Sequence, residues 1–180
     1  MKTALQMVGH NINSDRNKND FYPTPPEATL ALLEKEKFVG NIWECACGDG
    51  AISKVLIDKG YDTYSSDLYD MGYGETGIDF LTSNKKVDNI ITNPPFRISL
   101  EFTLKALESV NTKAVFLHKL TYLEGISRNN NIFKLKKLEK IYVFSRRLGF
   151  KKNDKKGGLM CFAWFIFDKN YNGLPTLDWI

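Results

Sequence analysis

Short apolar runs and amphipathic stretches alternate along most of the chain. Apolar residues recur at helical spacing over three stretches, 26–38, 51–59 and 99–110, and helical turns follow across the 120s and 130s. Between them lie runs typical of buried strands: 41–46, 61–66, a stub at Ile78, 87–92, 114–118, 140–144 and 160–167.

The first helix has a well-marked start. Residues 1–19 are polar and show little periodicity, which predicts a loose N-terminal segment. Thr24 then stands where an N-cap would, the prolines at 25 and 26 suit the first helical turn, and Glu27 completes a capping box.

The order of the elements predicts an α/β fold in a single domain, residues 20–180. Strands joined through helices pair in parallel, with helices on both faces of the sheet. The last two strands have no helix between them, so the final strand should run antiparallel. With the stub included, we expect a mostly parallel sheet of seven strands.

The composition of the chain argues against a membrane helix, a disulfide framework and a zinc site. The longest strongly apolar run, Leu159–Phe167, is nine residues, whereas a membrane helix needs about 20. The three cysteines are too few and too badly spaced for a disulfide framework, which indicates reduced thiols in a cytoplasm. The cysteines and the two histidines also lack the spacing of a zinc site, so we expect no metal.

Positive charge is concentrated in one segment, residues 134–156. It holds ten basic and two acidic residues, a net +8 in a chain whose total is +4. Such a concentration indicates a polyanionic partner, most often nucleic acid, and a solvated lysine-rich surface is the alternative.

Candidate binding residues follow three of the predicted strands. The turn Glu44–Gly50 leaves the first strand, where Gly48 and Gly50 let the backbone approach a ligand closely. A dinucleotide fingerprint would need a third glycine where Ser53 stands, which disfavours an NAD site. Asp67 ends the second strand, where a carboxylate can accept both hydroxyls of a ribose, and Asp79-Phe80 adds an acid and an aromatic ring at the same edge.

The run Asn93-Pro94-Pro95-Phe96 is the hardest to explain as structure alone. Two prolines at a strand end remove two N–H donors and stiffen the chain. They therefore hold the Asn93 carboxamide and the backbone carbonyls in fixed directions, with Phe96 as a flat platform. This arrangement suits a planar ring that carries an exocyclic amino group.

In this order the motifs resemble the S-adenosylmethionine-dependent amino methyltransferases, especially the DNA adenine-N6 type. Asn93–Phe96 follows a strand as in that family, the Glu44–Gly50 turn precedes it, and Asp20–Pro25 is similar to its methionine-binding segment. The stretch 116–150 resembles small bacteriophage-type members. The resemblance covers residues 20–168 and implies a Rossmann-like class I methyltransferase, in a host cytoplasm if it is encoded by a bacteriophage.

The resemblance also implies a role for each motif. The residues assigned to S-adenosylmethionine are Tyr22, Pro23, Thr24, Glu44, Gly48, Asp49, Gly50, Asp67, Asp79 and Phe80. The methyl-accepting adenine would be held by Asn93 and the Pro94 carbonyl, stiffened by Pro95, and would stack on Phe96. The basic loop 145–159, in place of a separate recognition domain, would bind nucleic acid through Arg146, Arg147, Lys151, Lys152, Lys155 and Lys156.

The implied reaction is direct in-line transfer of a methyl group to the N6 amino group of an adenine flipped out of DNA. Methylation of adenine in RNA or of a protein glutamine remains open, because the same pocket suits all three. The basic loop favours nucleic acid, with DNA preferred. An inactive, cofactor-binding nucleic-acid module is a further alternative.

Overall fold

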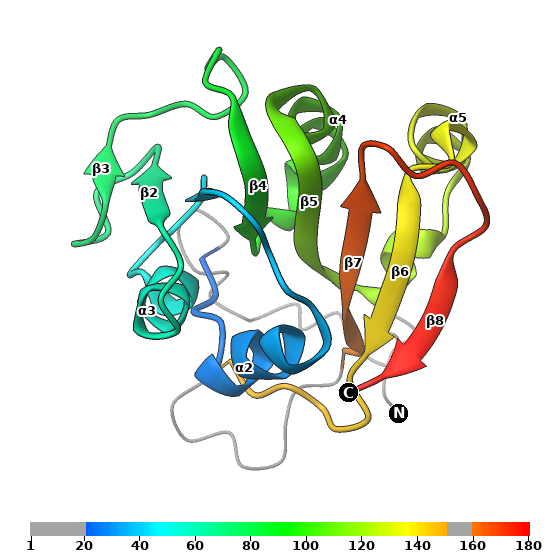
Figure 1. Cartoon of the computed structure of the whole chain (residues 1–180), viewed down its shortest axis with the longest axis horizontal. Coiled ribbons are helices and arrows are strands. Elements are labelled where there is room, and N and C mark those ends of the chain that lie inside the picture. The colour runs from blue at the N-terminus through cyan, green and yellow to red at the C-terminus, as the bar shows by residue number, and fades with distance from the viewer. Residues whose placement is uncertain (1–20, 151–159) are drawn as a thin grey trace, which may run out of the picture.

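The computed structural model describes residues 21–150 and 160–180. Within these residues a single eight-stranded sheet runs through the centre of the molecule, in the order β3-β2-β1-β4-β5-β7-β6-β8 (Figure 1). Its strands are β1 (Ile42–Glu44), β2 (Thr63–Asp67), β3 (Glu75–Thr76), β4 (Val87–Thr92), β5 (Val110–Lys119), β6 (Leu138–Val143), β7 (Phe162–Asp168) and β8 (Thr176–Trp179). β7 is antiparallel to both neighbours and the other pairs are parallel, so the predicted α/β class with one antiparallel strand is confirmed.

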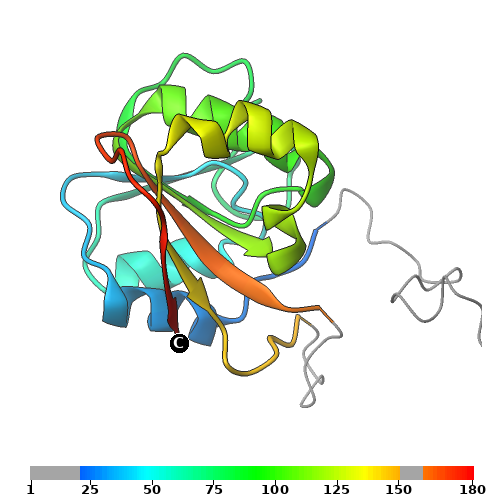
Figure 2. The same cartoon turned by 90° about the vertical axis from the view of Figure 1, so that its right-hand side faces the viewer.

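Helices cover both faces of the sheet (Figure 2). They are α2 (Pro26–Lys35) and α3 (Ala51–Asp58) on one face, and α4 (Ser99–Ser109) and α5 (Ile126–Asn131) on the other. Short 3-10 turns, η2 (Phe96–Ile98), η3 (Leu120–Leu123) and η4 (Phe133–Leu135), complete the connections. None of these described helices has the length and apolar character to span a membrane.

Strand β7 explains how the sheet supports two cores. Because successive side chains of a strand point to opposite faces, Trp164 and Ile166 pack with α2 and α3. Phe165 and Phe167 pack on the other face, in the core that includes Phe102 of α4. A strand buried on both faces reads as an uninterrupted apolar run, which is how this one appears in the sequence.

Hydrogen bonds hold helix α2 to the sheet at two points. They thereby also position residues 21–25, which precede the helix. The indole N–H of Trp164 donates to the Ala28 carbonyl at 2.8 Å. After the last turn, the Glu36 carboxylate accepts hydrogen bonds from Lys140 at 2.7 Å and from the Tyr142 hydroxyl at 2.6 Å. Burial raises the pKa of Glu36, but these bonds and Lys113 outweigh it, and the pKa lies below its ordinary value.

Several local predictions are wrong. The stub strand is Glu75–Thr76 rather than Ile78, and an eighth strand, β8, pairs in parallel with β6. All four β8 residues are exposed, and the alternation of polar and apolar residues in this edge strand extends over only four positions, too short to have revealed it. The first helix ends at Lys35, not at 38, because the backbone at Glu36 is extended.

The predicted capping box is also wrong. The N-cap of α2 is Pro25, which has no side-chain capping hydrogen bond. Thr24 lies one residue earlier, and its hydroxyl is 3.1 Å from the carboxamide nitrogen of Asn93. The Thr24 side chain therefore contacts a residue distant in sequence and does not cap the helix.

Candidate active site

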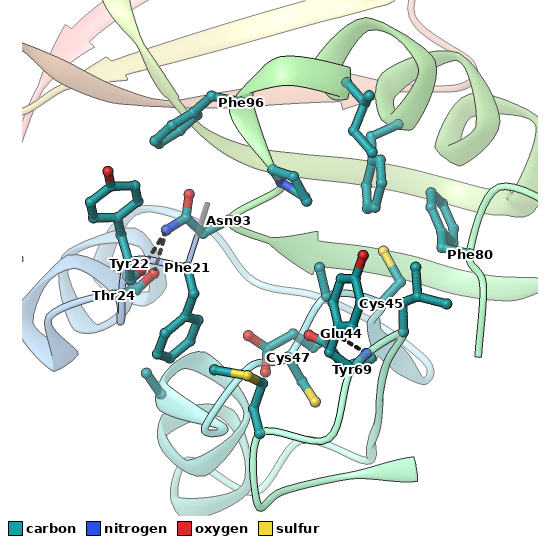
Figure 3. A pocket seen from close by; sticks show the side chains of 18 of the residues that line it. Phe21, Tyr22, Thr24, Glu44, Cys45, Cys47, Tyr69, Phe80, Asn93 and Phe96 are labelled. Carbon is teal, nitrogen blue, oxygen red and sulfur yellow. Dashed lines mark hydrogen bonds between the residues drawn. The ribbon is translucent and has the colours of Figure 1, made fainter. Parts of the chain in front are cut away.

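A cavity of about 940 Å³ opens at the carboxyl ends of β1, β2, β4 and β5. Its volume is at the upper end of the roughly 300–1,000 Å³ typical of small-molecule sites. Figure 3 shows Tyr22, Asn93 and Phe96 around one end and Cys45, Tyr69 and Phe80 toward the other, with Phe21 below Asn93 on the first side. The parallel strands thus bring the motifs of distant segments to a single edge of the sheet.

In the turn 48–50, Asp49 lines this cavity, whereas Gly48 and Gly50 do not. Both glycines have positive φ, +54° and +79°, a conformation that side chains rarely adopt. A Cβ at Gly48 would collide with the ring of Phe21, and one at Gly50 with the ring of Tyr73. In this structure, therefore, the close approach that the glycines permit is made by two aromatic rings of the chain itself.

Glu44 ends β1 and is fully enclosed. One carboxylate oxygen accepts the backbone N–H of Ser53, in the first turn of α3, at 2.7 Å, and it also accepts the Ser53 hydroxyl. Burial above all, with smaller effects of the nearby carboxylates Asp49 and Asp67, raises the pKa of Glu44 from an ordinary 4.5 to about 8, although the hydrogen bonds from Ser53 act to lower it. At neutral pH this carboxyl is therefore mostly protonated.

Three further acids line the same cavity. Asp67 accepts the backbone N–H groups of Gly48 and Tyr69, each at 2.9 Å, so it joins the loops after β1 and β2. Asp79 accepts the N–H of Leu81 at 2.9 Å. The Oδ1 of Asp49 is buried and has no hydrogen-bond partner among the described residues.

Asn93 follows β4, and its carboxamide has one definite orientation. The side-chain nitrogen donates to the Tyr22 carbonyl and to the Thr24 hydroxyl, both at 3.1 Å. A carbonyl can only accept, so the nitrogen must face this side. Oδ1 lies on the side of the Tyr22 and Phe96 rings (Figure 3), where it is buried without a partner among the described residues.

Phe96 begins η2 in an aromatic surrounding. Its ring centroid is 6.2 Å from that of Tyr22 at an interplanar angle of 28°, and 5.9 Å from that of Phe162. The ammonium nitrogen of Lys119, at the end of β5, lies 4.5 Å from the Phe96 ring centroid, within the range of a cation–π contact. Exposed Arg97 follows in the chain and also lines the cavity.

Most of the predicted site residues meet here. Those that line the cavity are Tyr22, Pro23, Thr24, Glu44, Asp49, Asp67, Asp79, Phe80, Asn93, Pro95 and Phe96. Of these, Phe80 is almost wholly in the core, packed on Trp43 and Phe102. Pro94, like the two glycines, is not part of the lining.

The predicted nucleic-acid contacts are placed only in part. Arg146 and Arg147 are exposed on an irregular segment after β6, outside the cavity lining. Lys151, Lys152, Lys155 and Lys156 lie outside the described residues, as does the predicted loose segment 1–19. Within residues 21–150 and 160–180, no group of three or more histidine, cysteine or acidic side chains could hold a metal ion.

Sequence reasoning missed several lining residues, among them Phe21, Tyr69, Arg97 and Lys119. Lys119 could have been predicted from the sequence, because it directly follows a predicted strand, 114–118, just as Asp67 and Asn93 do. Phe21 and Tyr69 gave no such signal. An aromatic residue in a loop is equally compatible with core packing.

No protein-family model and no curated protein matches the sequence. Solved structures match the fold. A protein assigned as an RNA methyltransferase of Pyrococcus horikoshii has a TM-score of 0.66 at 18% identity, over 87% of this chain and 91% of that one. A protein assigned as a class I S-adenosylmethionine-dependent methyltransferase of Listeria monocytogenes has a TM-score of 0.68 at 16% identity, over 98% and 71%.

Two further neighbours extend this comparison. A protein assigned as a modification subunit of a type I restriction enzyme from Vibrio vulnificus has a TM-score of 0.62 at 14% identity, over 97% of this chain but only 50% of that one. Magnesium protoporphyrin IX methyltransferase of Synechocystis, solved with bound S-adenosylmethionine, has a TM-score of 0.52 at 11% identity, over 81% and 76%. The chain thus has the Rossmann-like fold of the class I S-adenosylmethionine-dependent methyltransferases.

Proposed function

We propose that this protein transfers a methyl group from S-adenosylmethionine to the N6 amino group of adenine in DNA. The observation that carries the proposal is the Oδ1 of Asn93, a buried acceptor without a partner among the described residues, beside the aromatic ring of Phe96. Buried polar atoms are nearly always hydrogen-bonded, so an unpaired acceptor in a cavity is best explained by a ligand that donates. A planar base with an exocyclic amino group supplies both the donor and a ring for Phe96.

The opposite end of the cavity fits the cofactor. At neutral pH S-adenosylmethionine carries a positive sulfonium and a positive ammonium group against one carboxylate. The carboxylates Asp49, Asp67 and Asp79 line the cavity beside the neutral carboxyl of Glu44, and the buried Oδ1 of Asp49 suits an ammonium donor. Asp67, which ends β2, retains acceptor capacity for ribose hydroxyls beside its two backbone hydrogen bonds.

Charge favours nucleic acid over a protein substrate. The cations that line the cavity, Arg97 and Lys119, follow β4 and β5, and Lys119 lies against the Phe96 platform. A flipped nucleotide brings a phosphate with its base, and a phosphate beside these cations is favourable. A glutamine side chain in a neutral peptide brings no such charge. Exposed Arg146 and Arg147 add positive charge after β6.

In the proposed reaction the cofactor supplies an electrophilic methyl group, and the protein aligns the nucleophile. The adenine N6 lone pair is delocalised into the ring. A hydrogen bond from N6 to the Asn93 Oδ1 would favour a tetrahedral nitrogen, which localises that pair for in-line attack on the methyl carbon. The bond from this carbon to sulfur would break as the bond to N6 forms, S-adenosylhomocysteine would leave, and the extra proton on N6 would pass to water. Alignment of two bound reactants contributes about 7–11 kcal/mol to lowering a barrier. Stacking on Phe96 offsets part of the few kcal/mol needed to flip the base.

Methyl transfer from labelled S-adenosylmethionine to DNA, RNA and protein, followed by nucleoside and amino-acid analysis, tests this function. We expect N6-methyladenine in DNA. Asn93→Ala should abolish transfer and leave cofactor affinity, measured by calorimetry, within about twofold. If the label appeared in RNA or in glutamine instead, the proposed DNA substrate would be wrong. If the protein bound S-adenosylmethionine but transferred the methyl group to none of the three, it would be the inactive cofactor-binding module. Wild-type turnover by Asn93→Ala would refute the role of Asn93.

A further inference from the structure

The carboxamide of Asn93 is held from a segment 69 to 71 residues away in the chain. Both of its N–H groups are used, one by the Tyr22 carbonyl and the other by the Thr24 hydroxyl. Thr24 is only 4% exposed, and the helix that follows takes no capping hydrogen bond from a side chain. The Thr24 hydroxyl is therefore buried in contact with Asn93, and it does not cap the helix that follows.

From these contacts we infer that Thr24 is the positioning residue for Asn93: its hydroxyl keeps the carboxamide oxygen turned toward the target amino group. The inference rests on the proposed function and deepens it, because it assigns Thr24 to the target side of the site. The resemblance to the amino methyltransferases placed Thr24 with the cofactor. The contact with Asn93 indicates a second and separable role.

The need for such a residue follows from the symmetry of a carboxamide. Its oxygen and nitrogen have nearly the same shape, so rotation by about 180° exchanges an acceptor for a donor. Turned the wrong way, Asn93 would present N–H groups to the N–H groups of the substrate. The prolines that follow fix the backbone of Asn93, but they do not act on the rotation of its terminal amide.

Two acceptors on one side select a single orientation. The Tyr22 carbonyl accepts in every variant, because it belongs to the backbone. The Thr24 hydroxyl adds the second bond, and a neutral hydrogen bond contributes about 1 kcal/mol net. Thr24→Val keeps nearly the same shape and removes that bond, so the carboxamide loses one of its two constraints. Thr24→Ser keeps the hydroxyl and loses one methyl group.

The first test separates target chemistry from cofactor binding. For Thr24→Val we expect kcat for DNA methylation to fall about five- to tenfold, while the S-adenosylmethionine dissociation constant stays within about twofold. Thr24→Ser should recover most of the loss. Weaker cofactor binding with unchanged kcat would overturn the inference, since Thr24 would then serve the cofactor alone. An equal defect in the valine and serine variants would also overturn it, because packing rather than the hydroxyl would be responsible.

The second test does not depend on activity. In nitrogen-15 NMR spectra of the wild-type protein, the Asn93 side-chain amide, assigned by its absence in Asn93→Ala, should exchange slowly with water. Thr24→Val should accelerate this exchange about five- to tenfold while the melting temperature changes little, and Thr24→Ser should not. If the wild type transfers no methyl group and the exchange still responds, the proposed function fails and the positioning role stands. Unchanged exchange in Thr24→Val refutes the positioning role whatever the activity.

Discussion

Two buried titratable groups should give the stability of this protein an unusual dependence on pH. Glu44 is 2% exposed on the cavity floor, and burial first, then Asp49 and Asp67, raises its pKa from 4.5 to about 8. His118 is 1% exposed near the end of β5, and burial, with a smaller effect of Arg128, lowers its pKa from 6.5 to about 3. Each residue is therefore held in its neutral form by the fold.

The two groups act on stability with opposite signs. The folded state keeps a proton on Glu44 up to pH 8, whereas the unfolded chain releases it near 4.5, so this contribution is full below 4.5 and is lost as pH rises through about 8. His118 stays unprotonated in the folded state, so its contribution is full above 6.5 and is lost as pH falls toward 3. Each linkage changes the free energy of unfolding by about 1.4 kcal/mol per pH unit where it is fully developed.

From pH 5 to 6 the two slopes therefore cancel, and from 6.5 to 7.5 the Glu44 slope remains. Chemical denaturation of the wild type should give a free energy of unfolding that is flat from pH 5 to 6 and then falls by about 1 kcal/mol from pH 6.5 to 7.5. His118→Phe, which keeps a ring stacked on Tyr122, should uncover the Glu44 slope from pH 5 upward. Glu44→Gln should uncover the rising His118 slope and flatten the curve above pH 7.

The differences between each variant and the wild type cancel all other titrating groups. Glu34→Gln, which removes an exposed carboxylate from α2, is the matched control and should run parallel to the wild type. If the Glu44→Gln difference is constant from pH 5 to 7.5, Glu44 does not keep its proton in the folded state. The account of the cavity floor as a neutral, buried acid would then be wrong.

Other predictions concern the substrate end of the site. Phe96→Ala should reduce methylation more on duplex than on single-stranded DNA, measured as kcat/KM on matched oligonucleotides, because stacking worth about 1–3 kcal/mol per base must also hold the flipped base. Lys119→Met should flatten the salt dependence of DNA binding by about 0.7–0.9 in slope if it contacts one phosphate, whereas Lys59→Met, on an exposed residue after α3, should not. Neutralising Lys151, Lys152, Lys155 and Lys156 together should flatten the same slope by about that amount for each phosphate that these lysines bind, and an unchanged slope would make the basic loop a merely solvated surface.

The location of the site was predictable because it depends on where strands end. Asp67 and Asn93 directly follow the predicted strands 61–66 and 87–92, and the carboxyl ends of parallel strands share one edge of the sheet. A pattern of single residues after strands is therefore sufficient to place these side chains near one another. β3 was misplaced and β8 was not predicted, because strands of two and four exposed residues are too short for their ends to be located in the sequence.

Contacts between distant segments were not predictable in this way. The residues Tyr-Pro-Thr-Pro-Pro-Glu read locally as the start of a helix, and nothing within them indicates that Thr24 will contact Asn93. The ring of Phe21 over Gly48 is a contact of the same kind. Two glycines in a turn indicate that another group approaches the backbone closely. They do not show whether this group is a ligand or a side chain, because both require the same absence of a Cβ.

The distribution of charge in the cavity arises only when the chain folds. Its carboxylates come from the turn after β1, from β2 and from the segment after β3, whereas its cations, Arg97 and Lys119, come from the turn after β4 and the end of β5. Along the sequence these charges are interspersed with many others. In the sheet, β2 and β1 are followed by β4 and then β5. The acids therefore lie on one side of the cavity and the cations on the other. In the proposed reaction a cationic cofactor and a phosphate-bearing substrate would be attracted to opposite ends of the cavity, and the Asn93 carboxamide, following β4, would lie where the two reactants meet.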